Sequence, residues 1–136
     1  LDAGAGFTVA PNLDRQSVEL ALSRDRLHLP GVFTGSEIAA AMRLGARMLK
    51  LFPCDAHGPA LVRAMRAPFD DVDLVAVGGV NAANLSDFFA SGAVAVGLGS
   101  SVTKLVGDVS ALRREAAAIR AGIDTARGAL PPAARS

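Results

Sequence analysis

The sequence of 136 residues has no tryptophan, no tyrosine and a single cysteine, Cys54. One cysteine excludes an internal disulfide framework and is typical of proteins from a reducing cytoplasm. No apolar run approaches the roughly 18 residues of a membrane-spanning helix, and no charged-then-apolar leader marks export. The net charge is only +1, and basic residues are not interleaved with aromatic ones. We therefore expect a cytoplasmic protein that binds neither a membrane nor a nucleic acid.

Lysine is also scarce, because the chain has two lysines, Lys50 and Lys104, against twelve arginines. Lys50 lies at the centre of the apolar segment Met48-Leu49-Lys50-Leu51-Phe52-Pro53, which is predicted to be a strand. Burial disfavours an ammonium and makes the neutral, nucleophilic amine available for attack on a carbonyl. Alternatively, the stem of Lys50 packs in the strand while its head reaches water. The residues alone leave both possibilities open.

Apolar segments rich in β-branched residues alternate with segments of helical periodicity, in five strand–helix units. This pattern predicts an α/β fold, a parallel sheet covered by helices. Both an open doubly wound sheet and a section of a (β/α)8 barrel satisfy it. We expect one domain over residues 1–128 and a flexible tail over residues 129–136. The predicted strands are 7–11, 26–32, 48–53, 73–77 and 93–96. The predicted helices are 14–23, 36–44, 58–66, one that starts at Asn81 or Asn84 and ends at 91, and 110–127.

Two glycine loops follow the last two predicted strands. They read Val77-Gly78-Gly79-Val80 and Gly97-Leu98-Gly99-Ser100. Glycine lets the backbone approach an anion closely, and a following helix N-terminus favours phosphate. Loops in this position form the common phosphate site of barrel enzymes. Each loop alone is equally compatible with a tight turn between strand and helix, but the consecutive pair favours phosphate binding.

These motifs together resemble the 2-keto-3-deoxy-6-phosphogluconate aldolases, the KDPG/KHG aldolase family. The segments Thr8–Asn12 and Leu29–Val32 also lie where that family places its preceding strands, so the resemblance runs from Leu1 to about Val102. It implies strands four to eight of a (β/α)8 TIM barrel that forms cytoplasmic homotrimers. The segment Leu1–Gly4 looks like the end of a helix, so we expect a further N-terminal part.

The resemblance implies a class I aldolase that cleaves a phosphorylated 2-keto-3-deoxy sugar acid into pyruvate and glyceraldehyde 3-phosphate. Such an enzyme forms a Schiff base and needs neither a metal nor a cofactor. Lys50 matches the lysine that forms the imine, and Phe52 matches an aromatic residue beside the pyruvyl group. The phosphate would be held by Gly78, Gly79, Gly99 and Ser100, and the barrel mouth would be lined by Pro11 and Pro30.

Val77 suggests a sub-branch of the family. Members specific for the gluconate substrate tend to carry threonine before the Gly-Gly pair, whereas valine is more typical of the galactonate-phosphate members. Because valine cannot hydrogen-bond a sugar hydroxyl, discrimination between C4 epimers at this position is physically reasonable. The resemblance therefore favours the galactonate substrate.

Other features weaken the resemblance or leave it open. Cys54, Asp55 and His57 form a trio, but consecutive loop residues seldom converge on one metal ion, and His28 lies between leucines as a packed residue would. No acidic residue matches the family's acid–base glutamate. The alternatives are a catalytically inactive fragment, a phosphate-binding module of the same fold, or a transferase similar to thiamine-phosphate synthase, which would not need Lys50.

Overall fold

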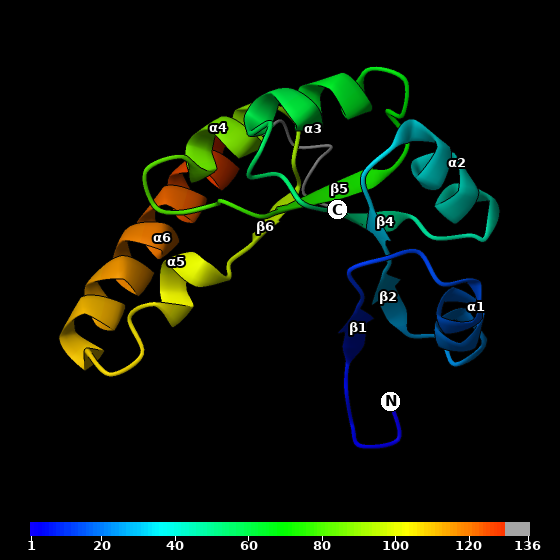
Figure 1. The fold of residues 1–136 in the computed structure, drawn as a ribbon, viewed down its shortest axis with the longest axis horizontal. Coiled ribbons are helices and arrows are strands. Elements are labelled where there is room, and N and C mark those ends of the chain that lie inside the picture. The colour runs from blue at the N-terminus through cyan, green and yellow to red at the C-terminus, as the bar shows by residue number, and fades with distance from the viewer. Residues whose placement is uncertain (130–136) are drawn as a thin grey trace.

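The structure is a computed structural model that describes residues 1–129 (Figure 1). Its strands are β1 (Phe7–Val9), β2 (Leu27–Leu29), β3 (Gly31–Val32), β4 (Met48–Leu51), β5 (Asp73–Val77) and β6 (Ala95–Gly97). Its helices are α1 (Arg15–Ser23), α2 (Gly35–Arg43), α3 (Pro59–Arg66), α4 (Leu85–Ala90), α5 (Ser100–Thr103) and α6 (Val109–Ala129). The prediction of an α/β fold with parallel strands is confirmed.

All strand pairs are parallel, and the order of the strands follows the chain. β1 pairs with β2, and a second sheet has the order β3-β4-β5-β6. Figure 1 shows α1 to α4 in an arc on one side of the strands. A doubly wound sheet would reverse its strand order at a switch point, with helices on both faces. The observed strand order is therefore that expected of a barrel segment and not of a doubly wound sheet.

The predicted strand over residues 26–32 is wrong in one respect, since Pro30 divides it into β2 and β3. The N–H of Lys50 donates to the carbonyl oxygen of Pro30 at 2.9 Å. Proline has no N–H to donate in return, so the ladder stops there and β2 pairs with β1 instead. Beyond the break, Gly31 lies against Pro11, whose carbonyl carbon would be 2.2 Å from a Cβ at Gly31.

The helix termini follow local capping rules. Asp14 caps α1 by accepting hydrogen bonds from the hydroxyl of Ser17 at 2.6 Å and from its N–H at 2.8 Å, and these two bonds hold the pKa of Asp14 below its ordinary value. The N-cap of α2 is Thr34, not the expected Ser36, because Thr34 and Glu37 form a reciprocal capping box. α6 matches the predicted last helix but still includes Ala129. The rest of the predicted tail, residues 130–136, lies outside the described residues.

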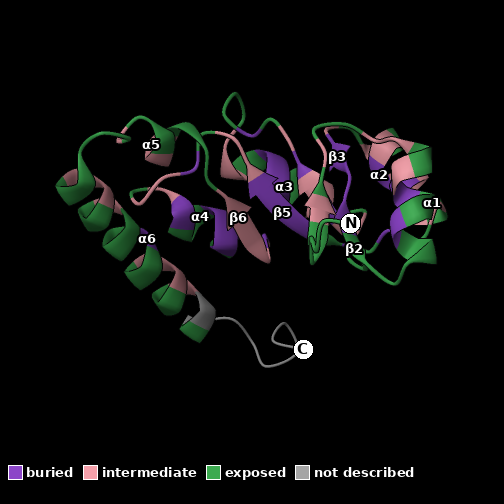
Figure 2. Cartoon of the chain, turned by 90° about the horizontal axis from the view of Figure 1, so that it is seen from below, coloured by how far each residue is buried: buried purple, intermediate pink, exposed green. Residues whose placement is uncertain are grey.

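The hydrophobic core lies between the helices and the outer face of the sheet. Leu49 and Leu51 of β4 are fully buried, whereas Met48 and Lys50, which alternate with them, are half-buried. Figure 2 shows burial concentrated around β5 and a largely exposed α6. The helices therefore cover one face of the sheet, and the other face is partly exposed to solvent. Among residues 1–129, no helix has the length and apolarity needed to cross a membrane.

Candidate active site

The residues singled out in the sequence meet at the carboxyl ends of the strands. Lys50 is paired in register with Gly31 and Val75, one residue before β4 ends. Gly78 follows β5 directly, and Gly99 begins the turn into α5 shortly after β6. Because the strands are parallel and aligned in register, these positions lie together at the carboxyl end of the sheet. Lys50 and both glycine loops are therefore on the same side of the molecule.

Lys50 is half-buried, between the enclosed amine and the water-exposed head that the sequence left open. Its face of the sheet is the one that no helix covers. The Nζ atom lies over the ring of Phe52, 4.2 Å from the ring centroid. Within residues 1–129, no carboxylate lies within ion-pair distance of Nζ. The aromatic face of Phe52 is thus the partner that the described chain offers to this amine.

The first glycine loop is shaped by close contact with the loop that follows β4. Gly78 and Gly79 have φ of +108° and +70°, which side chains rarely tolerate. A Cβ at Gly78 would lie 2.8 Å from the backbone nitrogen of Cys54, and a Cβ at Gly79 would lie 3.0 Å from the Cα of Asp55. The N–H of Cys54 donates to Val77 O at 2.9 Å. These glycines are therefore required by packing, whether or not they bind an anion.

The second glycine loop leads into a helix that the sequence pattern did not reveal. Gly99 caps α5, and its carbonyl accepts hydrogen bonds from Val102 and Thr103, both at 3.0 Å. A Cβ at Gly99 would meet nothing within 4 Å, so this turn is open. The first N–H groups of a helix have no partner within it. The four-residue length of α5 explains why hydrophobic periodicity could not detect it.

Val77 and the glycine that ends β6 pack against each other. Val77 ends β5 and pairs in register with Gly97, the last residue of β6. A Cβ at Gly97 would lie 2.6 Å from Cγ2 of Val77, so glycine leaves room for the valine side chain. Val77 is half-buried and, two residues after Val75, lies on the same face as Lys50.

The two prolines predicted to line the barrel mouth differ in exposure. Pro11 is exposed, and its backbone crosses Gly31 beside Lys50. Pro30 is fully buried. Because Gly31 shares the face of Lys50, Pro30 points to the opposite, helix-covered face. The structure therefore gives no support to a ligand contact for Pro30.

The trio in the loop after β4 does not converge. Cys54 is fully buried, its Sγ donates to Leu51 O at 3.1 Å, and burial raises the pKa of its thiol. Asp55 and His57 are exposed, and the His57 ring packs against Phe33 with centroids 5.9 Å apart. Among residues 1–129, no three His, Cys, Asp or Glu side chains gather as they would around a metal. A buried thiol of raised pKa is also a poor nucleophile.

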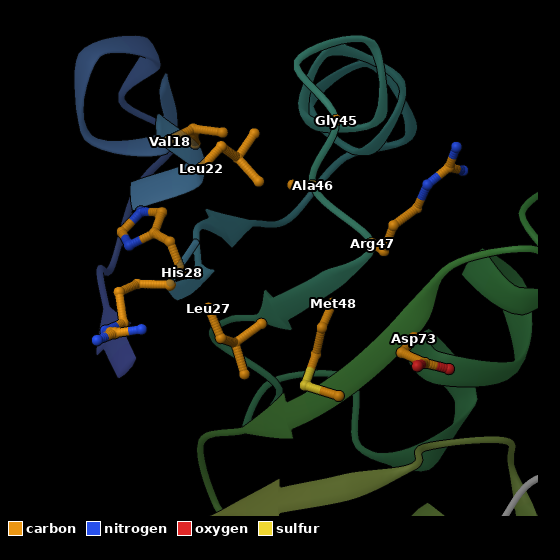
Figure 3. Close-up of a pocket in the computed structure, with 10 residues that line it drawn as sticks. Val18, Leu22, Leu27, His28, Gly45, Ala46, Arg47, Met48 and Asp73 are labelled. Atoms are coloured by element: carbon orange, nitrogen blue, oxygen red, sulfur yellow. The ribbon is translucent and has the colours of Figure 1, made fainter. Parts of the chain in front are cut away.

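A cavity of about 300 Å³ lies at the opposite end of the strands from Lys50 (Figure 3). Leu27, Met48 and Asp73, the first residues of β2, β4 and β5, line it together with Val18 and Leu22 of α1. It occupies the gap below the break at Pro30, where β2 and β4 are not paired. In Figure 3, the charged ends of Arg47 and Asp73 point away from it. Neither Lys50 nor either glycine loop lines this cavity.

Comparison with known proteins then decides the family. The model of the family described as KDPG and KHG aldolase matches residues 1–118. The chain belongs to the KDPG and KHG aldolase family. A probable 2-dehydro-3-deoxy-6-phosphogalactonate aldolase of Rhizobium meliloti is 38% identical over 128 residues, which cover 93% of this chain and 60% of that protein. A 2-dehydro-3-deoxy-phosphogluconate aldolase of Pseudomonas aeruginosa is 42% identical over 89 residues, 65% of this chain and 40% of that protein.

A solved structure supports the same assignment at the level of the fold. The structure described as native KDPGal has a TM-score of 0.86 at 30% identity and covers 93% of this chain and 62% of its own. The resemblance to this aldolase family that the sequence motifs predicted is thereby confirmed. This member of the KDPG and KHG aldolase family spans at most 60% of the length of the two curated relatives described above.

Proposed function

We propose that this chain carries the imine-forming and phosphate-binding parts of a class I aldolase. The observation that supports this most is the joint position of Lys50 and the two glycine loops at one edge of the sheet. Membership in a family whose named members are aldolases supports the reaction class. The substrate would be a phosphorylated 2-keto-3-deoxy sugar acid, cleaved reversibly to pyruvate and glyceraldehyde 3-phosphate.

In this proposal Lys50 is the nucleophile. Its neutral amine attacks the C2 keto carbon, and the resulting carbinolamine takes up a proton and loses water to give a protonated imine. The C4 hydroxyl then loses its proton and the C3–C4 bond breaks; the electron pair of that bond moves into the imine and leaves an enamine, while the C4 fragment departs as an aldehyde. Protonation of the enamine at C3 restores the protonated imine, and its hydrolysis releases pyruvate, a proton and the neutral amine. The protons taken up and released balance over the cycle, which needs neither a metal nor a cofactor.

The other proposed contacts surround the lysine. Phe52 lies beside the reacting nitrogen, and Pro11 lies at the same edge of the sheet. The phosphate would be bound by the backbone amides of the two loops and a hydroxyl, because glycine turns and helix N-termini present N–H groups to anions. The residues in this role would be Gly78, Gly79, Gly99 and Ser100.

We further propose the galactonate epimer as the preferred substrate. Val77 lies on the Lys50 face and carries no hydroxyl with which to hydrogen-bond the sugar. The name of the R. meliloti relative agrees with this preference. We also infer that the strands correspond to strands four to eight of a TIM barrel, and that the complete protein is a cytoplasmic homotrimer.

A second candidate follows from the finding that no carboxylate in residues 1–129 lies within ion-pair distance of Lys50 Nζ. Without a positioned acid–base group, proton transfer at C3 should be slower, commonly by about 10²–10⁴-fold. The chain by itself would then form the imine, or bind phosphate, without rapid turnover. The transferase alternative, similar to thiamine-phosphate synthase, has no corresponding support, because it leaves Lys50 without a role.

Borohydride trapping tests the proposal. The purified chain is incubated with pyruvate, reduced with borohydride and analysed by intact mass and peptide mapping. We expect one adduct, on Lys50, whose mass equals that of pyruvate less water plus two hydrogens. Lys50→Met should abolish it, and the matched variant Lys104→Met should retain it. An unmodified wild-type chain would contradict the proposal.

A cleavage assay with each C4 epimer of the phosphorylated substrate then separates the two candidates. Pyruvate release faster than that of Lys50→Met supports the aldolase. A trapped adduct without pyruvate release supports the second candidate, in which the chain forms the imine only.

A further inference from the structure

Two asparagine side chains that follow the first glycine loop hold one of its carbonyl groups. The Nδ2 atoms of Asn81 and Asn84 donate to the carbonyl oxygen of Gly79, at 3.2 and 3.0 Å. Oδ1 of Asn84 accepts from the N–H of Asn81 at 2.9 Å, and Oδ1 of Asn81 accepts from the N–H of Ala83 at 2.9 Å. Each side-chain amide is therefore engaged at both ends, and the Gly79 carbonyl is their common acceptor.

These hydrogen bonds fix a peptide group that two glycines would otherwise allow to turn. Gly78 and Gly79 both have a positive φ, and glycine permits several backbone orientations at little steric cost. In a planar trans peptide, the C=O and the N–H that follows it point in opposite directions. With the oxygen of Gly79 held by the asparagines, the N–H of Val80 points away from them. The two side chains thus select one orientation of this peptide.

The N–H groups of the loop are left without acceptors in this orientation. Within residues 1–129, neither the N–H of Gly79 nor that of Val80 donates a hydrogen bond. Val80 is only 3% exposed, and unpaired N–H groups of buried backbone are rare. Successive backbone N–H groups without an internal acceptor can bind an anion. A reversed peptide would instead present the Gly79 carbonyl oxygen, which repels a phosphate oxygen.

We propose that Asn81 and Asn84 are positioning residues, which hold the Gly79 peptide so that the loop offers N–H groups, and not a carbonyl oxygen, to a phosphate group. The inference rests on the phosphate-binding role proposed above for this loop. Asn84 is the N-cap residue of α4, yet its side chain makes no capping hydrogen bond and donates to the loop instead. Both asparagines would act through the backbone of Gly79 and not by contact with the ligand.

A set of variants separates the hydrogen bonds from an effect of charge. Asn84→Asp keeps the oxygen that accepts from Asn81 and replaces the Nδ2 donor by a second oxygen. Asn84→Ala removes the donor without adding charge. The matched control, Ala83→Asp, adds a carboxylate at an exposed residue of the same segment and leaves both donors in place. Asn81→Ala removes the other donor and gives an independent test if Asn84→Asp does not fold.

The measurement is a titration of the isotope-labelled chain with inorganic phosphate, followed by NMR through the backbone amide signals of Gly79 and Val80. We expect phosphate to shift both signals in the wild type and, with a similar dissociation constant, in Ala83→Asp. The dissociation constant should rise about three- to tenfold in Asn84→Asp and Asn84→Ala, as for the loss of one orienting hydrogen bond. Borohydride trapping of pyruvate on Lys50 should be unchanged in all variants, because pyruvate carries no phosphate.

The outcomes separate this inference from the proposed function. Phosphate affinity that is retained in both Asn84 variants, or lost equally in Ala83→Asp, overturns the positioning role. Loss of the pyruvate adduct together with phosphate affinity also overturns it, because a general disturbance of the site would act on both. A wild-type chain that forms the adduct but binds no phosphate overturns the positioning role and leaves the imine chemistry standing. Phosphate binding that depends on Asn84, without any adduct, supports the positioning role and overturns the imine chemistry.

Discussion

At the scale of single residues, two side chains acquire properties that depend on their partners. The Nζ atom of Lys50 lies over the ring of Phe52, as described above. His28 is buried beneath α1, and its Nδ1 shares a hydrogen bond of 2.8 Å with Thr8 Oγ1. Its Nε2 has no partner among the described residues. Burial lowers the pKa of His28 despite the nearby charge of Asp14, which acts in the opposite direction. The packed histidine expected from the sequence is confirmed.

His28 should therefore make stability depend on pH. The folded state holds it neutral, whereas the unfolded chain binds a proton near the ordinary value of 6.5. Its contribution is fully present above that value and is lost as the pH falls through it, because protons then bind preferentially to the unfolded state. We expect thermal melts to show this decrease in the wild type and in His57→Gln, but not in His28→Gln. The same pH dependence in all three proteins would contradict the assignment.

At the scale of elements, the loops after the strands differ in what their glycines do. Gly79 has a positive φ and lies against Asp55, so the backbone conformation at this position requires glycine. Gly99 has φ of −127° and open space around it. A substitution at Gly79 would thus test packing, and one at Gly99 would test a role beyond packing.

We predict a corresponding difference between two alanine variants. Gly79→Ala should lower the free energy of unfolding by about 1–3 kcal/mol, because a Cβ is both strained and crowded there. Gly99→Ala should leave it within about 0.5 kcal/mol of the wild type. Urea denaturation measures both. Equal losses of stability would show that the second loop is as tightly packed as the first.

At the scale of the whole molecule, the sheet has unpaired edges and an uncovered face. Among the described residues, β1 pairs only with β2, and β6 only with β5. Phe7 and Val9 of β1 are 58% and 51% exposed, and Leu27 beside them is 46% exposed. Unpaired strands with exposed apolar side chains promote association between chains.

A charge on this edge should reduce self-association. We expect Val9→Lys to shift the purified chain toward monomer in sedimentation velocity at high concentration, because lysine on an edge strand disfavours strand addition. The control is Val106→Lys, which alters a more exposed valine, at 78%, outside the strands. An equal shift in both variants would indicate a general effect of charge and not an effect at the edge.

Much of the fold and of the candidate site could be predicted from the sequence. The apolar segments around Lys50 and Val75, the glycine loops and the helix ends at Gly45 and Gly92 are local signals, since periodicity and allowed backbone angles depend on nearby residues. The Lys50 segment and the two glycine loops also carried the family resemblance. Helix α5 escaped because four residues show no period, and Thr34 was missed as a cap although Glu37 follows it at the capping-box spacing.

Tertiary structure decided the rest. The break at Pro30 depends on which strand lies beside it. The N–H that proline lacks matters only where a carbonyl oxygen of the neighbouring strand would have accepted a hydrogen bond from it. The half-burial of Lys50 depends on which face the helices cover, and the burial of Cys54 depends on a loop folding over β5. The sequence by itself determined the order of elements and the candidate chemistry. Contacts between residues far apart in the chain determined which side chains are enclosed, because solvent exclusion is a property of the assembled layers.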